Sequence, residues 1–437
     1  MKIERIQLRD FKPFEQLELE LDPNVTLLIG ENGAGKTSVL EALSIVAGVW
    51  LYDVPDSKLS NSRRSLTDVD IRLVPDQSSG DRIQFRETQS TAVSGWGKLA
   101  SDENTVQWTQ TISHGKKSKT GLAVAREFIK SRYELDEQGN EVLLPVIGYY
   151  GAGRASLTHR KRREHIKPSM EKSRRWAAFY DCLNERIRFS DLKQWFLRET
   201  TERGNRNGND RSGFKIVKQA IINCIPDATA VWFDTDRMDI VVAIGETVQP
   251  SENMSAGQRM MLGLIADIAI KCVVQNNFLV RPSQVEKDEP QEVLDKTPGV
   301  ILIDEVDVHL HPSWQRRVIS DLVSTFPSIQ FVCTTHSPQV LGEIKHDQVY
   351  QLKNGHAARL HQSFGLESSW LLDHAMQASS KSGVVSEELS KIQKAMNEMD
   401  LAKAETSLNA LRNLTGPSPD VVRLETALRR LRQNIGS

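Results

Sequence analysis

The sequence predicts an α/β fold over residues 1–365 and an all-helical module over residues 366–437. Three observations support this division. A glycine-rich loop at residues 30–37 (GENGAGKT) lies between a short apolar run and a helical pattern. Residues 300–305 (VILIDE) read as a buried strand that ends in two acids, and after Gly383 apolar residues recur every three or four positions. The first two patterns are typical of a parallel sheet with flanking helices, and the third predicts amphipathic helices.

Bulk composition narrows the class of protein. The chain has 437 residues and a net charge of −1, so any DNA contact has to come from a local basic patch. Its charged start alternates like a strand, and no apolar stretch approaches the length of a membrane span, so we expect a cytoplasmic protein with no membrane contact. The cysteines form no C-x-x-C pair, and we expect four reduced core residues, Cys182, Cys224, Cys272 and Cys333.

The first fifty residues predict strand, turn, strand, loop, strand, glycine-rich loop and helix. Leu17, Leu19 and Leu21 alternate along the second strand, and the apolar residues 25–29 form the third. A G-x-x-x-x-G-K-[ST] loop between a strand and a helix can wrap its backbone N–H groups around a triphosphate at the helix N-terminus. The alternative is a glycine-rich turn with a chance lysine, which both flanks of the loop disfavour.

Each position of this loop has a chemical reason. The glycines permit positive φ angles and close approach of the main chain to phosphate. Lys36 can reach the β- and γ-phosphates of ATP, and the Thr37 hydroxyl can bind Mg²⁺. The predicted nucleotide-binding residues of the loop are Gly30, Asn32, Gly33, Gly35, Lys36, Thr37 and Ser38.

The middle of the chain is less regular. Residues 51–142 are polar and strand-like, which predicts a β-rich segment, and residues 143–150 predict a buried strand. Aromatic residues at helical spacing then predict a helical insertion at about residues 155–225. Residues 200–213 and 282–298 are predicted to be mobile loops.

The helical insertion begins with a basic run. Its arginines are candidates for contacts with a DNA backbone, which would bind through counterion release. A solvated or partner-facing loop is the competing interpretation. The candidate residues are Arg160, Arg162 and Arg163.

The acidic strand end at residues 300–305 supplies the second part of an ATPase. Asp304 is suited to hold Mg²⁺ through water, and Glu305 is suited to polarise the attacking water. A buried strand that merely ends in an acid at a sheet edge is the alternative, but two consecutive acids after four apolar residues disfavour it.

Further motifs follow in a familiar order. Residues 254–258 (MSAGQ) precede a helical run and resemble the L-S-G-G-Q signature of ABC-type ATPases, with Ser255, Gly257 and Gln258 matching. Asp307 lies where that superfamily has its D-loop, and His336 lies after an apolar strand where the family has its switch histidine. The pair His309 and His311 invites a metal site, but the resemblance already explains their place in the turn.

The resemblance implies how these parts cooperate. In ABC-type ATPases the signature serine grips the γ-phosphate bound to another subunit, and the switch histidine contacts the γ-phosphate. One chain would therefore not complete a site, and an ATP-sandwiched, head-to-tail dimer is implied. The fold implied is an ABC-type P-loop ATPase head, with a mixed β-sheet lobe, flanking helices and a RecF-like helical lobe.

The start of the chain resembles RecF, SMC and OLD-type heads. Across most of its length the sequence is similar to the PtuA ATPases of Septu-type anti-phage defence, also found with some retrons. The supporting text is LPVIGYYGAGR, YDCL with KQWF, DEVDVHLHPSWQ, TTHSPQVL and FGLESSWLL. This resemblance implies a regulatory ATPase that binds ATP and Mg²⁺ and is assembled with a separate HNH nuclease, PtuB.

One departure from the superfamily concerns the Q-loop. A glutamine that joins the Mg²⁺ shell should follow the strand at residues 143–149, yet residues 150–154 read YGAGR. Water or another side chain would have to fill that place. The departure favours ATP as a conformational switch over rapid hydrolysis.

The C-terminal module leaves two readings open. Its heptad-like stripes are each too short for a long coiled coil. They fit a helical hairpin folded onto its own chain, or an oligomerisation or partner-docking module. For the whole protein the rivals are a RecF-like DNA repair or recombination ATPase that binds DNA without a nuclease, and a scaffold in which nucleotide only sets oligomer geometry.

Overall fold

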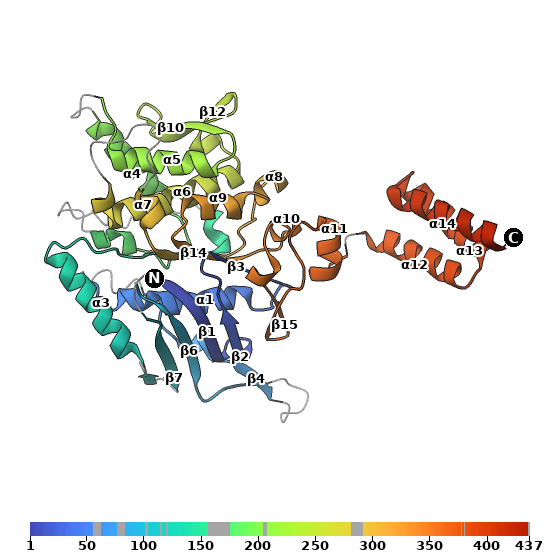
Figure 1. The fold of residues 1–437 in the computed structure, drawn as a ribbon, viewed down its shortest axis with the longest axis horizontal. Coiled ribbons are helices and arrows are strands. Elements are labelled where there is room, and N and C mark those ends of the chain that lie inside the picture. Colours follow the sequence, from blue (N-terminus) through green and yellow to red (C-terminus); the bar gives the residue numbers. More distant parts are fainter. Residues whose placement is uncertain are drawn as a thin grey trace. The chain divides into compact units, whose positions relative to one another are not determined.

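The structure is a computed structural model that describes residues 1–55, 63–76, 84–100, 104–113, 116–118, 121–155, 175–203, 208–280, 292–376, 378–379 and 381–435. The chain divides into two compact units, Met1–Leu366 and Glu367–Ser437 (Figure 1). Each unit is described by itself below.

A six-stranded sheet forms the centre of the first unit. Five of its strands run parallel to a neighbour in the order β15-β3-β14-β13-β9, and β16 pairs antiparallel with β15 at one edge. The strands are β3 (Val25–Gly30), β9 (Val146–Tyr150), β13 (Gly299–Ile303), β14 (Ile329–Thr334), β15 (Val349–Lys353) and β16 (His356–Arg359). Every residue of β9, β13 and β14 is buried, which explains their continuous apolar text, because a parallel sheet is covered on both faces.

The two faces of this sheet carry different layers. Figure 1 shows α1 (Lys36–Ala47) on one side of β3 and β14, with the strands of a second sheet beyond it. On the other side lies α6 (Ala256–Gln275) among further helices. Those helices are α4 (Phe189–Glu202), α5 (Ser212–Cys224), α7 (Glu292–Lys296), α8 (Pro312–Gln315), α9 (Val318–Thr325) and α10 (Pro338–Leu341).

The second sheet is antiparallel and packs on α1. Its order is β2-β1-β6-β7-β8, formed by β1 (Lys2–Phe11), β2 (Phe14–Glu20), β6 (Thr91–Lys98), β7 (Val106–Ser113) and β8 (Lys116–Ser118). The buried Trp108 indole donates to the Val46 carbonyl at 3.0 Å, so the sheet is joined to the end of α1. Two smaller sheets are β4 (Leu73–Asp76) with β5 (Gln84–Glu87), and β10 (Ala228–Asp234), β11 (Asp239–Ile244) and β12 (Thr247–Pro250).

The predicted start of the chain is confirmed, whereas the middle differs in three places. Residues 51–142 contain the expected strands but also the helix α3 (Leu122–Glu137), whose buried residues Leu122, Ala125, Ile129 and Tyr133 recur at helical spacing. Helix α4 extends into the predicted loop 200–213, and α7 lies inside the predicted loop 282–298. In these places apolar residues at helical spacing form a helix although most of the surrounding residues are polar.

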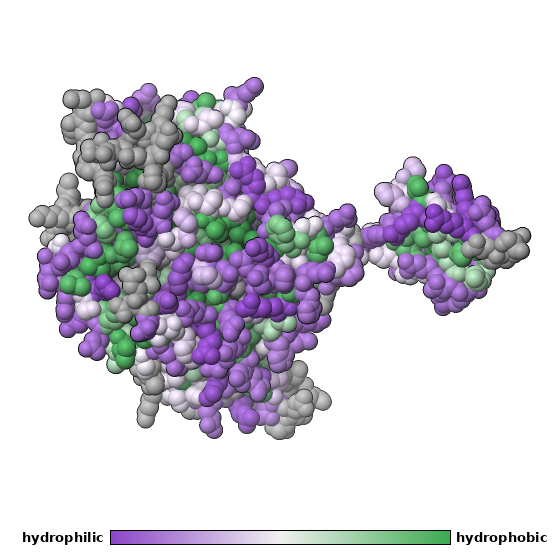
Figure 2. All heavy atoms as spheres, viewed as in Figure 1, coloured by the Kyte–Doolittle hydropathy of each residue, from purple (hydrophilic) through white to green (hydrophobic). Residues whose placement is uncertain are grey.

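The second unit is helical and has a core of its own. It contains α11 (Ser368–Trp370), α12 (Gly383–Asn397), α13 (Leu401–Thr415) and α14 (Pro419–Ile435). The apolar stripes of the last three helices meet in a cluster that includes Ile392, Leu408, Leu411 and Leu424. Figure 2 shows hydrophobic residues along the middle of this unit with hydrophilic residues on either side. The three amphipathic helices α12, α13 and α14 thus bury their apolar faces against one another.

Candidate nucleotide site

The glycine-rich loop follows β3 and leads directly into α1. Gly30 ends β3, residues 31–35 form the turn, and Lys36 begins α1, with Thr37 and Ser38 in its first turn. Gly35 has a φ of +94°, and a Cβ there would lie 2.4 Å from Cζ of Phe14, so only glycine fits between the loop and β2. The loop therefore has the strand-turn-helix setting that phosphate binding requires.

Lys36 folds back over this loop. Its Nζ donates to the carbonyl oxygens of Gly30 at 2.9 Å and Glu31 at 3.0 Å, and the residue is only 7% exposed. Burial lowers the pKa of the Lys36 ammonium, while the negative charges of Asp304, Glu305 and Asp307 act in the opposite direction. The ammonium is therefore within electrostatic reach of all three predicted acids.

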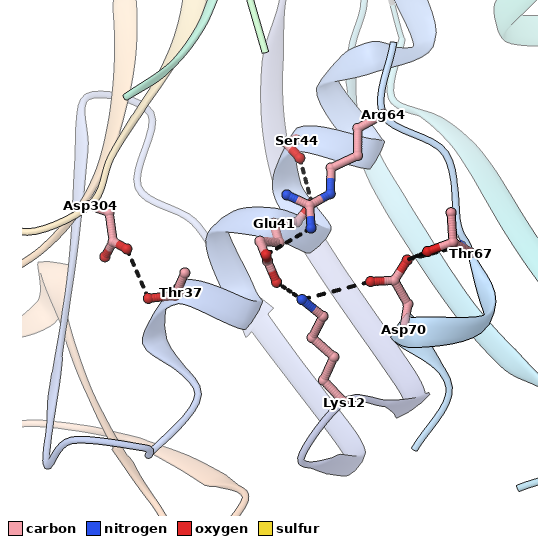
Figure 3. A network of polar contacts seen from close by, with 8 residues as sticks. All are labelled: Lys12, Thr37, Glu41, Ser44, Arg64, Thr67, Asp70 and Asp304. Atoms are coloured by element: carbon pink, nitrogen blue, oxygen red, sulfur yellow. Dashed lines mark hydrogen bonds and ion pairs between the residues drawn. The ribbon is translucent and has the colours of Figure 1, made fainter. Parts of the chain in front are cut away.

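Thr37 and Asp304 meet at the carboxyl ends of the parallel strands. The Thr37 hydroxyl donates to Oδ2 of Asp304 at 2.8 Å, as Figure 3 shows. The Thr334 hydroxyl donates to Oδ1 of the same carboxylate at 2.5 Å. Asp304 is 5% exposed, and its two oxygens are oriented by hydroxyl groups from the first turn of α1 and from the end of β14. Hydroxyl and carboxylate oxygens are ligands that Mg²⁺ prefers, so these residues fit the ion.

Glu305 has an unusual backbone conformation. Its φ is +50°, a left-handed value that is uncommon for a residue with a side chain. Its N–H donates to the Thr334 hydroxyl at 2.7 Å, so the same threonine holds both acids. The sequence reading missed Thr334, although the pair of threonines before His336 was a signal for it.

Asp307 is connected to the segment that carries His336. The Thr335 hydroxyl donates to Oδ1 of Asp307, and the N–H of Ser337 donates to the Thr335 hydroxyl at 2.9 Å. His336 lies between these two residues and is exposed. The structure therefore brings the acids of residues 304–307 and the segment of His336 together at one edge of the sheet.

The histidine pair after Asp307 has a structural explanation. Nδ1 of His311 accepts a hydrogen bond from the Ser313 N–H at 3.3 Å and caps α8. His309 is exposed and has a φ of +60° in the turn. Within the described parts of the chain, no group of three or more His, Cys, Asp and Glu side chains is arranged to hold a metal ion.

The signature residues form the start of α6. Ser255 is its N-cap, and Ser255 and Gln258 exchange hydrogen bonds in a capping box, with distances of 3.0 and 3.2 Å. A Cβ on Gly257 would lie 2.2 Å from the His309 carbonyl oxygen, so glycine lets α6 rest on the turn after Asp307. Ser255 is exposed, and α6 lies on the other side of the central sheet from α1 (Figure 1).

A buried network fixes the segment that leads into α6. Nζ of Lys193 lies 3.0 Å from Oδ1 of Asp239, and the hydroxyl of Ser251 and the N–H of Glu252 donate to the same carboxylate. Burial raises the pKa of Asp239, but the hydrogen bonds from Ser251 and Lys193 outweigh it, and the pKa is lowered. The sequence reading missed this network, because its members come from three separate elements.

A second network lies along α1, one turn after Thr37. Figure 3 shows Glu41 paired with Lys12 and Arg64, and Lys12 also facing Asp70. Nη2 of Arg64 is 2.8 Å from Oε1 of Glu41. These ion pairs join α1 to the residue that follows β1 and to the segment before β4.

Three further predictions concern the arginines proposed for DNA, the cysteines and the membrane. Arg160, Arg162 and Arg163 lie outside the described residues. All four cysteines are buried, as expected for core residues. Among the described residues, no helix combines the length and apolar character needed to cross a membrane.

The parallel sheet, the loop before α1 and the acids after β13 define a P-loop ATPase head. A family model described as an AAA domain matches residues 5–225, about half of the chain, and the chain belongs to this family. A second model, described as an AAA domain, putative AbiEii toxin, Type IV TA system, matches residues 156–342.

Named relatives extend the match over most of the chain. The "Retron Ec83 probable ATPase" of Escherichia coli is 23% identical, covering 87% of this chain and 77% of its own length. The "Septu protein PtuA" of Bacillus thuringiensis is 22% identical, covering 78% and 72%. The solved SMC head domain from Thermotoga maritima is 14% identical with a TM-score of 0.44, covering 82% and 98%. The homologues of this chain thus include Septu PtuA proteins and retron probable ATPases.

Proposed function

We propose that this chain is an ATP-binding regulatory subunit of an anti-phage defence complex, which controls a separate HNH-type nuclease through ATP-dependent pairing of its heads. The observation that carries the nucleotide chemistry is the Thr37–Asp304 hydrogen bond beside the loop of Lys36. The Septu and retron homologues support the defence context.

The residues divide the work in the following way. Lys36 binds the β- and γ-phosphates, which would replace the carbonyl partners of its ammonium. Thr37 and Asp304 hold Mg²⁺, which supplies charge neutralisation and orientation of the phosphates. Glu305 orients the attacking water, and His336 and Asp307 face the γ-phosphate from the adjoining segment.

The pairing of heads rests on the signature residues. Ser255, Gly257 and Gln258 start a helix of 20 residues whose first N–H groups and dipole favour an anion, and Ser255 is exposed. The proposed anion is the γ-phosphate bound to a second copy of the chain. A head-to-tail dimer would then contain two complete sites.

Nucleotide binding and hydrolysis are tested separately. Lys36→Ala should abolish ATP binding in calorimetry, because it removes the cation at the phosphates. Glu305→Gln should keep binding and lower turnover about 100-fold or more, the range for loss of a general base. The control Glu246→Gln changes an exposed acid between β11 and β12. Turnover by the native protein no faster than by Glu305→Gln would remove hydrolysis and leave ATP as a switch.

The partner is tested by co-purification with neighbouring gene products, followed by a nuclease assay with and without ATP. We expect a small HNH protein to co-purify and its cleavage of DNA to depend on Lys36. Direct, ATP-dependent DNA binding by the chain alone, without any nuclease, would favour a RecF-like repair role instead.

A further inference from the structure

The buried hydroxyl of Tyr149 has no hydrogen-bond partner among the described residues. Tyr149 lies in β9 and is 1% exposed. Burial, followed by the negative charges of Asp304 and Glu185, raises the pKa of the phenol, while Arg64 acts in the opposite direction. The phenol is therefore neutral, and the charges of both carboxylates act on it. Leaving a buried donor without a partner is destabilising, so the hydroxyl calls for a water or ligand oxygen.

Glu185 lies against the chain directly after β9. The Gly151 N–H donates to the Glu185 carbonyl at 3.0 Å. A Cβ on Gly151 would lie 2.8 Å from Cβ of Glu185 and 3.1 Å from its Oε2. The absence of a side chain at Gly151 therefore lets Glu185 occupy the place next to the strand end.

The same strand end adjoins Asp304. The Asp304 N–H donates to the Tyr150 carbonyl at 2.8 Å, and the Tyr149 N–H donates to the Cys182 carbonyl at 2.8 Å. Residues 182–185 therefore run beside the end of β9, which pairs with β13 up to Asp304. This is the position in which the sequence lacks the expected glutamine.

The charge of Glu185 acts on a basic residue beside α1. The Glu185 carboxylate raises the pKa of Lys12, although burial, the largest effect, lowers it. Lys12 lies beside α1 in the network of Figure 3, one helical turn beyond Thr37. Glu185 is exposed to solvent.

We propose that Glu185 and Tyr149 complete the Mg²⁺ site in place of the missing glutamine, with the Glu185 carboxylate and the Tyr149 hydroxyl holding oxygen ligands of the ion. Mg²⁺ keeps several waters when it has few protein ligands, and those waters need hydrogen-bond partners. Thr37 and Asp304 would supply two oxygen-bearing groups, and Glu185 and Tyr149 would hydrogen-bond the waters that the ion keeps. This inference rests on the proposed function.

The test measures metal affinity directly in the full-length protein. Mn²⁺ replaces Mg²⁺ as the probe, and its dissociation constant in the presence of a non-hydrolysable ATP analogue is read from electron paramagnetic resonance. Glu185→Ala should weaken Mn²⁺ binding about 10-fold or more, as loss of a group that orients metal ligands typically does. Tyr149→Phe should weaken it in the same direction, while Glu185→Gln should retain most of the affinity, because an amide oxygen replaces the carboxylate.

Matched controls separate this inference from the proposed function. Glu246→Ala removes an exposed acid elsewhere and should leave the Mn²⁺ constant unchanged. If Lys36→Ala binds the analogue as well as the native protein does, the proposed function fails. If binding depends on Lys36 but either Glu185→Ala or Tyr149→Phe matches Glu246→Ala in Mn²⁺ affinity, the inference is overturned. Melting curves confirm that each variant is folded.

Discussion

A single hydroxyl group organises both acids of the candidate site. Thr334 is fully buried at the end of β14, and its hydroxyl contacts the Asp304 carboxylate and the Glu305 N–H. Glu305 holds a left-handed backbone conformation, which costs free energy unless its surroundings fix it. The orientation of the side chain expected to activate water therefore depends on a residue that never touches the substrate.

Thr334→Val tests this dependence, because it keeps the shape of the side chain and removes the hydroxyl. We expect the free energy of unfolding to fall by about 1–3 kcal/mol, since the Glu305 N–H loses its acceptor. Turnover should fall more than ATP affinity, since Lys36 and the loop are unchanged. Denaturant unfolding, calorimetry and a turnover assay measure the three quantities.

Thr325→Val is the matched control, since Thr325 is also buried and its hydroxyl accepts a hydrogen bond from the Cys224 thiol at 3.2 Å. It should lower stability without changing the ratio of turnover to affinity. An equal change of that ratio in both variants would show that Thr334 has no specific role at the site.

At the scale of elements, α6 connects two parts of the nucleotide chemistry. Ser255 and Gln258 form a capping box, so they stabilise the start of α6 even in a single chain. Gly257 allows this helix start to approach the His309 carbonyl closely. The helix is buried along most of its length, and Tyr150 in β9 donates to Asp267 on α6 at 2.6 Å. The position of the signature segment is therefore fixed by β9 and by the turn that follows the acids.

Gly257→Ala should disturb this position. Its Cβ would meet a carbonyl oxygen 2.2 Å away, and overpacking of this kind costs about 1–3 kcal/mol. We expect ATP-dependent dimerisation, measured by light scattering, to be lost while ATP binding in calorimetry persists. At Gly263 in the same helix, the nearest atom to a Cβ is Cγ2 of Ile187 at 3.3 Å, so Gly263→Ala should dimerise normally. Normal dimerisation of Gly257→Ala would contradict the proposed role of the signature.

Local patterns revealed the loop at residues 30–37, the strand before Asp304 and the helices of the second unit, because each is encoded in a short window. Local patterns could not predict contacts that depend on the register between strands. Thr334 reaches Asp304 through the parallel pairing of β13 with β14, in which Ile303 lies opposite Cys333. Glu185 contacts Gly151 although more than thirty positions separate the two residues in the sequence, and no local spacing specifies that contact. The helix α3 was missed because its polar exposed face outweighed a stripe of four buried residues.

At the scale of the whole molecule, the two units have separate cores. The cluster of the second unit consists of residues from α12, α13 and α14, and that of the first includes residues from β1, α1 and α3. Apolar side chains such as Val384, Met399, Leu414 and Val422 remain more than half exposed in the second unit. These side chains are available for contacts with another chain, which is consistent with the predicted assembly role.

Truncation after Leu366 separates nucleotide chemistry from assembly. ATP affinity should stay within about twofold of that of the full chain, because the loop and the acids belong to the first unit. The number of chains per particle, measured by light scattering, should fall. Leu408→Asp, which places a charge in the second core, should have the same effect as truncation. An unchanged number of chains per particle in both variants would leave the second unit as an appendage of its own chain.

The contact between Gly257 and the His309 carbonyl has a consequence for a pair of chains. In each chain Gly257, two residues after Ser255, rests on the turn that follows Glu305. In the head-to-tail pairing proposed above, that serine grips the nucleotide of the second copy. Loss of phosphate from one site would then weaken nucleotide binding at the other. The two sites would therefore hydrolyse ATP in alternation and not at the same time.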